Sequence, residues 1–336
     1  MLLERICTYR KGKQTAERKV HRMNEKTRIQ IEEMKKQTIG VEVEMYNITR
    51  EQACKTIATY FHTEDTVRYL GGAYKAWSCK DNQGRTWKIT RDSSIQAQHD
   101  DERTEMGTPI LRYDDIEDLQ EILRQLRHKG AKSDPAHMCG VHIHIGLDDH
   151  TPNSLRNLAN IMASHESLLI SALRLDRNRI SNYCRTVDPD FLGRLNRRKP
   201  KTMEDLADIW YANNRYENRN AHYNHSRYRM LNYHACFTHG TIEFRCFQFA
   251  NADGKRRGGL HAGELKSYIQ LCLALSQMAK TVKSASPKEP QVENPKYAMR
   301  TWLLRLGFIG EEFATAREIL TRNLDGDTAF RHGRAA

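Results

Sequence analysis

The chain has 336 residues, which is enough for one large domain or two of ordinary size. Lysine and arginine number 54 and aspartate and glutamate 42, so the net charge of +12 suits an anionic partner such as nucleotide phosphate, nucleic acid or an acidic polymer. No stretch approaches the roughly 18 apolar residues of a membrane span, and the first residues lack the apolar run of a signal peptide. The eight cysteines include no C-x-x-C pair, which is typical of buried thiols in a reducing compartment. We therefore expect a soluble, cytoplasmic protein with no membrane partner.

The first 38 residues form a basic segment. They hold eleven lysines and arginines and five glutamates, a net charge of 11 − 5 = +6, and few apolar residues. This composition predicts a flexible or helical basic arm, and its charge leaves a weak contact with nucleic acid open.

Periodicity predicts the elements that follow. Residues 39–46 alternate as a strand, and Thr49 with Gln52 three positions later forms a capping box that begins a helix running to about residue 61. Residues 63–84 have the pattern of an irregular segment. Two more strands are expected at 85–90 and 103–108, on either side of a polar turn around Asp92. An amphipathic helix is expected at 114–129.

The second half of the chain is more helical. We expect strands at 141–147 and 241–249, and helices at 152–175, 259–280, 297–306 and 311–323. Residues 176–230 are rich in arginine, asparagine and tyrosine and give no clear pattern, and three prolines in 284–296 indicate a linker. The expected domains are the arm at 1–38, a catalytic domain at 39–283, the linker at 284–296 and a short helical segment at 297–336. Because adjacent strands lack helical crossovers, the fold class is α+β with an antiparallel or mixed sheet.

Three of the expected strands carry ionisable residues at alternate positions. The motifs are G-V-E-V-E-M, G-V-H-I-H-I-G and T-I-E-F-R-C-F, and the pairs are Glu42 and Glu44, His142 and His144, and Glu243 and Arg245. Residues i and i+2 share one face of a strand, and the apolar residues between them need a core on the other face. If these strands are neighbours, one face of the sheet bears carboxylates, imidazoles and a guanidinium, and helices pack on the other.

Carboxylates held this close repel one another unless a cation lies between them. Oxygen-rich ligation with some imidazole suits Mg²⁺ or Mn²⁺. Glu105, in R-T-E-M-G-T-P-I, would add another carboxylate, and Arg227 and Arg229 could clamp phosphate or carboxylate. Each motif alone has a plainer interpretation: a solvated strand face for E-x-E, a cross-strand ion pair for E-x-R, and an exposed basic loop for the arginines.

Taken in order, these motifs resemble the amidoligase family, which shares the fold of glutamine synthetase and glutamate–cysteine ligase. The resemblance runs from about residue 40 to 280. The segments that carry it are GVEVEM (40–45), WKITRDSS (87–94, with Ser93 where the family usually has glycine), TEMGTPIL (104–111), CGVHIHIG (139–146), NRISNYCR (178–185), RYRMLNYHA (227–235) and GTIEFRCF (240–247).

The resemblance implies a role for each residue. The metal ligands would be Glu42, Glu44, Glu105, His142 and Glu243. The residues nearest the ATP phosphates would be His144, Arg227, Arg229 and Arg245, of which His144, Arg229 and Arg245 would take part in catalysis and Arg245 would also face the acyl intermediate.

The implied activity is an ATP- and divalent-metal-dependent ligase that joins a carboxylate substrate to an amine substrate through an acyl phosphate. The substrates could be small molecules, peptides or protein side chains, and a homo-oligomer is left open. No G-x-x-x-x-G-K-[ST] motif is present, so a P-loop does not hold the phosphates. Two other classes stay open. One is a metal-dependent amide hydrolase that needs no ATP, and the other is a non-enzymatic basic module whose binding to nucleic acid falls steeply with salt.

Overall fold

The computed structural model describes residues 24–213, 216–250 and 259–329, and one antiparallel sheet forms its centre. The strand order is β2-β3-β4-β5-β1-β6-β8-β7, and each strand runs antiparallel to its neighbours. The strands are β1 (Ile39–Met45), β2 (Arg68–Gly71), β3 (Ala76–Lys80), β4 (Thr86–Arg91), β5 (Thr104–Gly107), β6 (Val141–Gly146), β7 (Leu231–Asn232) and β8 (Thr241–Phe247). The α+β fold class is confirmed, and of the two sheet types the antiparallel one is present.

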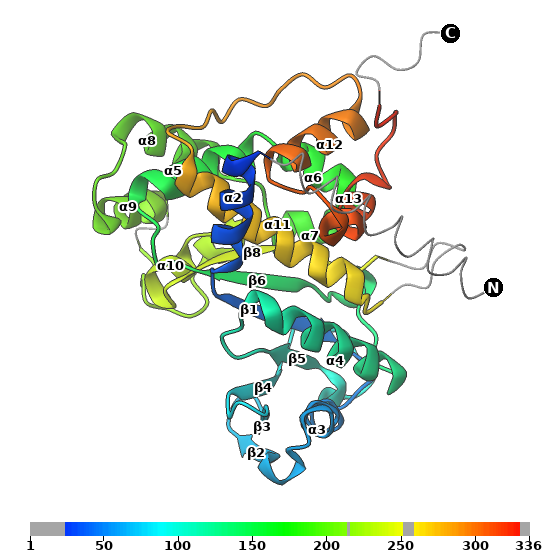
Figure 1. The fold of residues 1–336 in the computed structure, drawn as a ribbon. Helices are drawn as coiled ribbons and strands as arrows, with labels where there is room; N and C mark the ends of the chain where they lie inside the picture. Colours follow the sequence, from blue (N-terminus) through cyan, green and yellow to red (C-terminus); the bar gives the residue numbers. More distant parts are fainter. Residues whose placement is uncertain (1–23, 214–215, 251–258, 330–336) are drawn as a thin grey trace, which may run out of the picture.

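Helices cover the apolar face of this sheet (Figure 1). The face is made by alternate residues, and Val43, Met106 and Ile89 lie directly opposite one another across β1, β5 and β4, each fully buried. Full burial of one such side chain contributes about 1.5–3 kcal/mol. The covering helices are α3 (Arg50–Phe61), α4 (Ile116–His128) and α11 (Ala262–Thr281).

Further helices pack on α11, and they come from both ends and from the middle of the chain. They are α2 (Glu25–Lys35), α5 (Pro152–Ala163) and α13 (Ala314–Thr321), and α12 (Pro295–Arg305) packs on α13. Ile31 and Met34 of α2 are buried in the same core as Trp302 of α12. Part of the basic arm and the C-terminal helices therefore share the core of the main domain, while residues 1–23 lie outside the described residues. The division into four segments stays a prediction.

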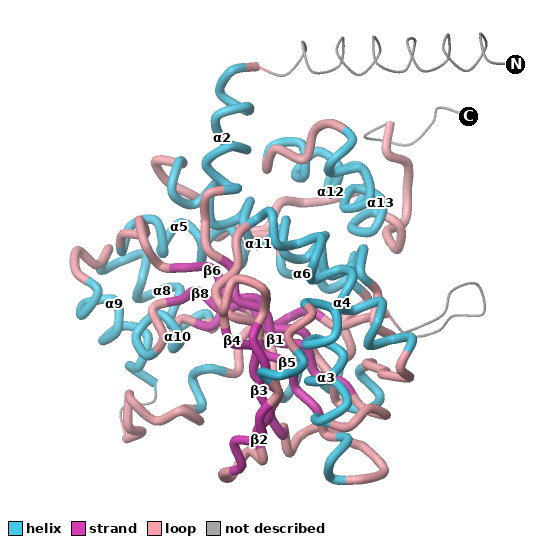
Figure 2. The backbone as a smooth tube through the Cα atoms, turned by 60° about the horizontal axis from the view of Figure 1, so that its bottom comes forward, coloured by secondary structure: helices cyan, strands magenta, loops and turns pink. Residues whose placement is uncertain are grey.

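Figure 2 shows the strands running together through the centre of the molecule, with β2 far from α12 and α13. In the described ranges, every helix is too short or too polar to cross a membrane.

Residues 152–175 form two helices, so the expectation of one long helix was wrong. Helix α5 ends at Ala163, and α6 (Glu166–Leu173) begins after two intervening residues. The hydroxyl of Ser164 donates to the carbonyl of Ile161 at 3.0 Å, and His165 Nδ1 lies 3.0 Å from the same oxygen. These side chains compete with the backbone for that carbonyl, which favours the break.

Residues 63–84 were expected to be irregular, but they contain β2 and β3. Strand β2 is the edge of the sheet, and all its residues are exposed or half-exposed. A strand without a buried face shows no alternation of apolar and polar residues, so the sequence gives no period to detect.

The unassigned stretch 176–230 contains three short helices, α7 (Arg177–Asn182), α8 (Pro189–Arg198) and α9 (Met203–Trp210), and α10 (His234–Thr238) follows β7. The first three begin after side-chain caps at Asp176, Asp188 and Thr202. Asp-Pro at residues 188–189 and Thr-x-x-Asp at residues 202–205 are sequence signals that predict the starts of α8 and α9.

The capping box predicted at the start of α3 is present and can be tested by mutation. Thr49 Oγ1 accepts from the Gln52 backbone N–H at 3.2 Å, and Gln52 Oε1 accepts from the Thr49 N–H at 3.1 Å. We expect Thr49→Ala to lower the free energy of unfolding by about 1 kcal/mol. Urea unfolding would measure the loss, and Thr49→Ser, which keeps the oxygen, should remain near the wild type. A Thr49→Ala midpoint equal to that of the wild type would contradict a stabilising cap.

Candidate active site

The register of the central strands gathers the ionisable motif residues on one face. Glu42 lies opposite His142, Glu44 opposite Glu105, and His144 opposite Glu243. Residues directly opposite each other in an antiparallel pair project to the same side of the sheet. This side is the one away from α3, α4 and α11, so the two faces predicted from the i, i+2 pattern are both present.

His142 lies at the centre of the cluster. Its Nδ1 is 3.0 Å from Glu42 Oε2 and 3.8 Å from Glu243 Oε1, and its Nε2 is 3.7 Å from Glu44 Oε1. His144 lies beside it, with Nε2 3.5 Å from Glu42 Oε1. Glu42, Glu44 and Glu243 thus contact the imidazole of His142, and His144 contacts the same carboxylate of Glu42. These predicted residues come from three separate segments of the chain.

A second group of residues holds Glu44 in place. The backbone N–H of Gly140 donates to Glu44 Oε2 at 2.6 Å, and Arg179 Nη1 lies 4.0 Å from the same oxygen. A Cβ at position 140 would lie 2.2 Å from Arg179 Nη2. A side chain at position 140 would therefore displace the buried guanidinium, which packs directly against the backbone that binds Glu44.

Glu243 is held by partners on β7 and β8. Asn232, directly opposite it on β7, donates from Nδ2 to Glu243 Oε2 at 2.6 Å. Arg245 Nη1 donates to Glu243 Oε1. Arg245 is 5% exposed, and its Nε is buried without a hydrogen-bond partner among the described residues. The arginine therefore keeps a donor that a ligand could use.

The protonation of the cluster follows from its crowding. Burial and the charges of Glu42, Glu44 and Asp92 raise the pKa of Glu105 well above its usual value. Burial also opposes ionisation of Glu42, but hydrogen bonds with His142 and His144 outweigh it and bring the Glu42 pKa well below the usual value.

The pKa of Glu243 shows the same competition. Burial raises it, but the charges of Arg245 and the two histidines bring it down to about 2. Burial lowers the pKa of His144, while Glu243 and Glu42 outweigh burial and raise it. The cluster thus contains ionised carboxylates beside one carboxyl, Glu105, that resists ionisation.

The donor atoms are arranged as cation ligands. Three sets of residues each place their potential ligand atoms within 4.8 Å of one another: Glu42, Glu105 and His142; Glu42, His144 and Glu243; and Glu44, Asp92 and Glu105. His144 Nε2 is buried and has no hydrogen-bond partner in the described part of the chain. Carboxylate oxygens with an imidazole fit Mg²⁺ or Mn²⁺.

Arg227 and Arg229 have partners other than the carboxylates of the cluster, although Arg227 shares the ring of Tyr228 with Arg245. Arg229 pairs with Asp188 at 2.8 Å and lines a separate cavity of about 220 Å³ with Phe191 and Trp210. Arg227 Nη1 donates to the carbonyl of His222 at 2.8 Å. Among the described residues neither arginine has an ion pair with a carboxylate of the cluster.

Sequence reasoning missed several residues that belong to the site. Asp92 joins a ligand set, Arg179 positions Glu44, and the ring of Tyr228 lies 5.9 Å from Arg245 Cζ. All three lie in segments that carry the family resemblance, so the order of motifs was the signal that could have found them.

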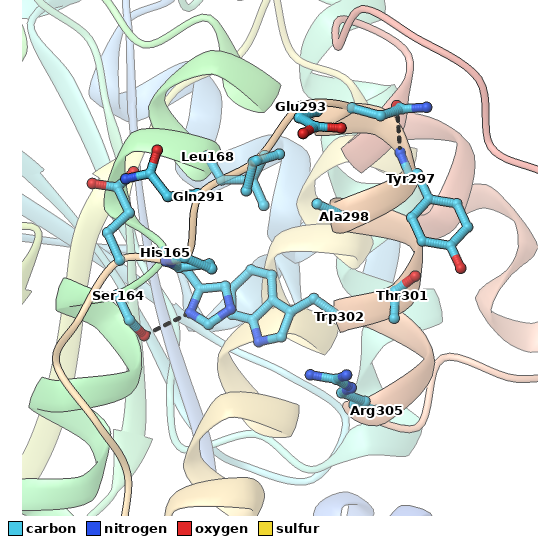
Figure 3. A pocket seen from close by; sticks show the side chains of 14 residues that line it. Ser164, His165, Leu168, Gln291, Glu293, Tyr297, Ala298, Thr301, Trp302 and Arg305 are labelled. Carbon is cyan, nitrogen blue, oxygen red and sulfur yellow. Dashed lines mark hydrogen bonds between the residues drawn. The ribbon is translucent and has the colours of Figure 1, made fainter. Parts of the chain in front are cut away.

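A larger cavity lies elsewhere in the fold, beyond α11 from the sheet. It has a volume of about 520 Å³ and lies between α12, the start of α6 and residues 289–294 (Figure 3). Its wall includes the stacked rings of His165 and Trp302, with centroids 4.0 Å apart. None of the residues of the carboxylate cluster lines it.

The candidate active site is thus a carboxylate–imidazole cluster on one face of an antiparallel sheet. The family model described as "Putative amidoligase enzyme" matches residues 35–276. The chain therefore belongs to this amidoligase family, and the family supports a carbon–nitrogen ligase as its kind of activity.

Other comparisons add little. No curated protein matches the chain. Among solved structures, a bifunctional glutathione synthetase from Pasteurella multocida is similar, with 12% identity, a TM-score of 0.44, and coverage of 90% of this chain and 49% of that one. The chain thus spans about half the length of that protein, and a likeness this low carries no argument about fold or activity.

The crowding of Glu105 predicts a pH-dependent stabilisation by cations. Because its pKa is raised in the folded state, the metal-free protein loses stability as pH rises above the usual carboxyl range, and a bound cation removes this repulsion. We expect Mn²⁺ or Mg²⁺ to raise the unfolding temperature more at about pH 8 than at about pH 5, with about 2.7 kcal/mol at roughly a hundredfold excess over Kd.

Thermal unfolding with and without cation would measure this difference. Glu105→Gln should remove most of the pH dependence, because the amide does not ionise. An equal shift at both pH values would contradict the assignment of Glu105 to the cation site.

Proposed function

We propose that this chain is an ATP- and divalent-metal-dependent carboxylate–amine ligase that works through an acyl phosphate. The observation that carries the proposal is the meeting of Glu42, His142 and Glu243 from three strands on one face of the sheet. Membership of the amidoligase family supports the reaction class. The amide hydrolase and the nucleic-acid-binding module explain the cluster less well, since the first disregards the family and the second has no use for buried glutamates.

The proposed reaction has two steps. An oxygen of the substrate carboxylate attacks the γ-phosphorus of ATP, the bond to the bridging oxygen breaks, and ADP leaves. The nitrogen of the amine then attacks the acyl carbon, the carbon–oxygen bond to phosphate breaks, and the amine gives up a proton. The products are an amide, ADP and inorganic phosphate.

The metal site would be formed by Glu42, Glu44, Glu105, His142 and Glu243, together with Asp92. When bound there, Mg²⁺ or Mn²⁺ would neutralise the charge of the phosphates. The residues that remain for the reacting groups are His144 and Arg245. Arg245 Nε is buried without a hydrogen-bond partner in the described chain, and His144 Nε2 has Glu42 Oε1 as a neighbour at 3.5 Å.

Arg245 would stabilise charge on the transferring phosphoryl group. Its guanidinium is held by Glu243 and lies near Tyr228, so its position is set before any ligand arrives. Arg229 is assigned no part in this reaction, because it is paired with Asp188 away from the cluster.

The most informative variant is Glu42→Gln. The side chain of Glu42 keeps 35% exposure, so the change removes a charge without leaving a fully buried group unpaired. We expect ATP-dependent activity to fall by roughly a hundredfold or more, with the unfolding temperature nearly unchanged. Glu51→Gln, on the exposed surface of α3, is the matched control and should keep full activity.

The activity itself would be measured as ADP release by the purified chain with Mg²⁺ or Mn²⁺ and ATP, across mixtures of acids and amines. Release that requires both an acid and an amine is the expected result. Amide cleavage without ATP, or activity that Glu42→Gln leaves intact, would contradict the proposal.

A further inference from the structure

The polar face of the sheet continues beyond the carboxylate cluster onto β4. Register places Ser78, Lys88, Gly107, Glu42 and His142 opposite one another in a row across β3, β4, β5, β1 and β6. Directly opposite residues share a face, so Lys88 projects to the same side as the cluster. Its Cα lies two strand spacings from that of Glu42, which is about 10 Å.

Gly107 leaves the space between Lys88 and Glu42 free of a side chain. A Cβ at this position would have one neighbour within 4 Å, the carbonyl oxygen of Lys88 at 3.5 Å. There is therefore room for a methyl group at position 107. Only the backbone of the sheet lies between the side chains of Lys88 and Glu42 at this point. A ligand above Gly107 could contact the sheet closely.

Glu42 is the most exposed of the three carboxylates that contact His142. Its side chain is 35% exposed, compared with 6% for Glu44 and 4% for Glu243. The next positions along the row from Glu42 are Gly107 and Lys88.

Lys88 is exposed and has no ion pair among the described residues. The two arginines at the ends of the same strand differ, since Arg85 pairs with Asp81 and Asp115, and Arg91 pairs with Asp100. The ammonium group of Lys88 therefore carries a positive charge that is in no ion pair with a described carboxylate.

We propose that Lys88 binds the polyphosphate chain of the nucleotide. In the row, Lys88 is separated from the cluster residues Glu42 and His142 by Gly107. The proposal rests on the function proposed above. A metal-bound carboxylate is too short to extend from Glu42 to Lys88, whereas a polyphosphate is an extended anion that could span Gly107. A lysine also suits this role, because its ammonium is a point charge that can reach phosphate oxygens from several directions.

The experiment measures binding rather than turnover. The full chain is titrated calorimetrically, in the presence of Mg²⁺, with a non-hydrolysable ATP analogue and separately with inorganic tripolyphosphate. We expect Lys88→Ala to weaken both ligands by roughly tenfold to a hundredfold. Lys88→Arg should recover most of the affinity, and Mn²⁺ binding without nucleotide should stay at the wild-type value.

Lys129→Ala is the matched control, since Lys129 is an exposed lysine at the C-terminus of α4, on the helical side of the sheet. It should bind both ligands as the wild type does. If Lys88→Ala binds both ligands like the wild type, the inference is wrong. A wild-type chain that binds neither ligand would instead contradict the proposed function together with this inference.

Discussion

The alternation of β1 and its pairing with β6 is the constraint on which this site depends. The same strand puts Val41 and Val43 into the core and Glu42 and Glu44 on the open face. A slip of one residue would turn the carboxylates into the layer packed by α3 and α11, where an unpaired charge costs several kcal/mol. Packing of the apolar residues thus fixes the register, and the register in turn sets which ionisable residues meet.

Bringing like charges together has a cost that the surrounding residues only partly offset. Arg179 and the Gly140 N–H stabilise Glu44, and Arg245 and Asn232 stabilise Glu243. Glu105 accepts a hydrogen bond from the hydroxyl of Thr90, but burial and the charges of Glu42, Glu44 and Asp92 outweigh it and raise the Glu105 pKa. A cation would complete the set, so its binding energy would add to the stability of the sheet.

The sequence predicted what is local and periodic. The i, i+2 pairs placed Glu42, His142 and Glu243 on a shared face, and Thr49 with Gln52 located the start of α3. The position of Arg229 could not be predicted, because its partner Asp188 is 41 residues away and lies in a stretch without periodicity. Asp92 was read as a turn residue, and only the pairing of β4 with β5 brings it to Glu105.

Apart from Asp92, the cluster lies on strands, whereas Tyr74, His222 and Tyr223 lie on loops. The hydroxyl of Tyr223 is 3.1 Å from that of Tyr74, which joins the loop before β7 to the turn between β2 and β3. His222, whose pKa is lowered by burial and by Arg227, is near enough to Glu42 and Glu243 to feel their charge. Strands hold ligating groups rigidly and loops tolerate change. Metal and phosphate chemistry would therefore be set by the sheet, and the choice of acid and amine by the loop of residues 216–228 and the turn that it contacts.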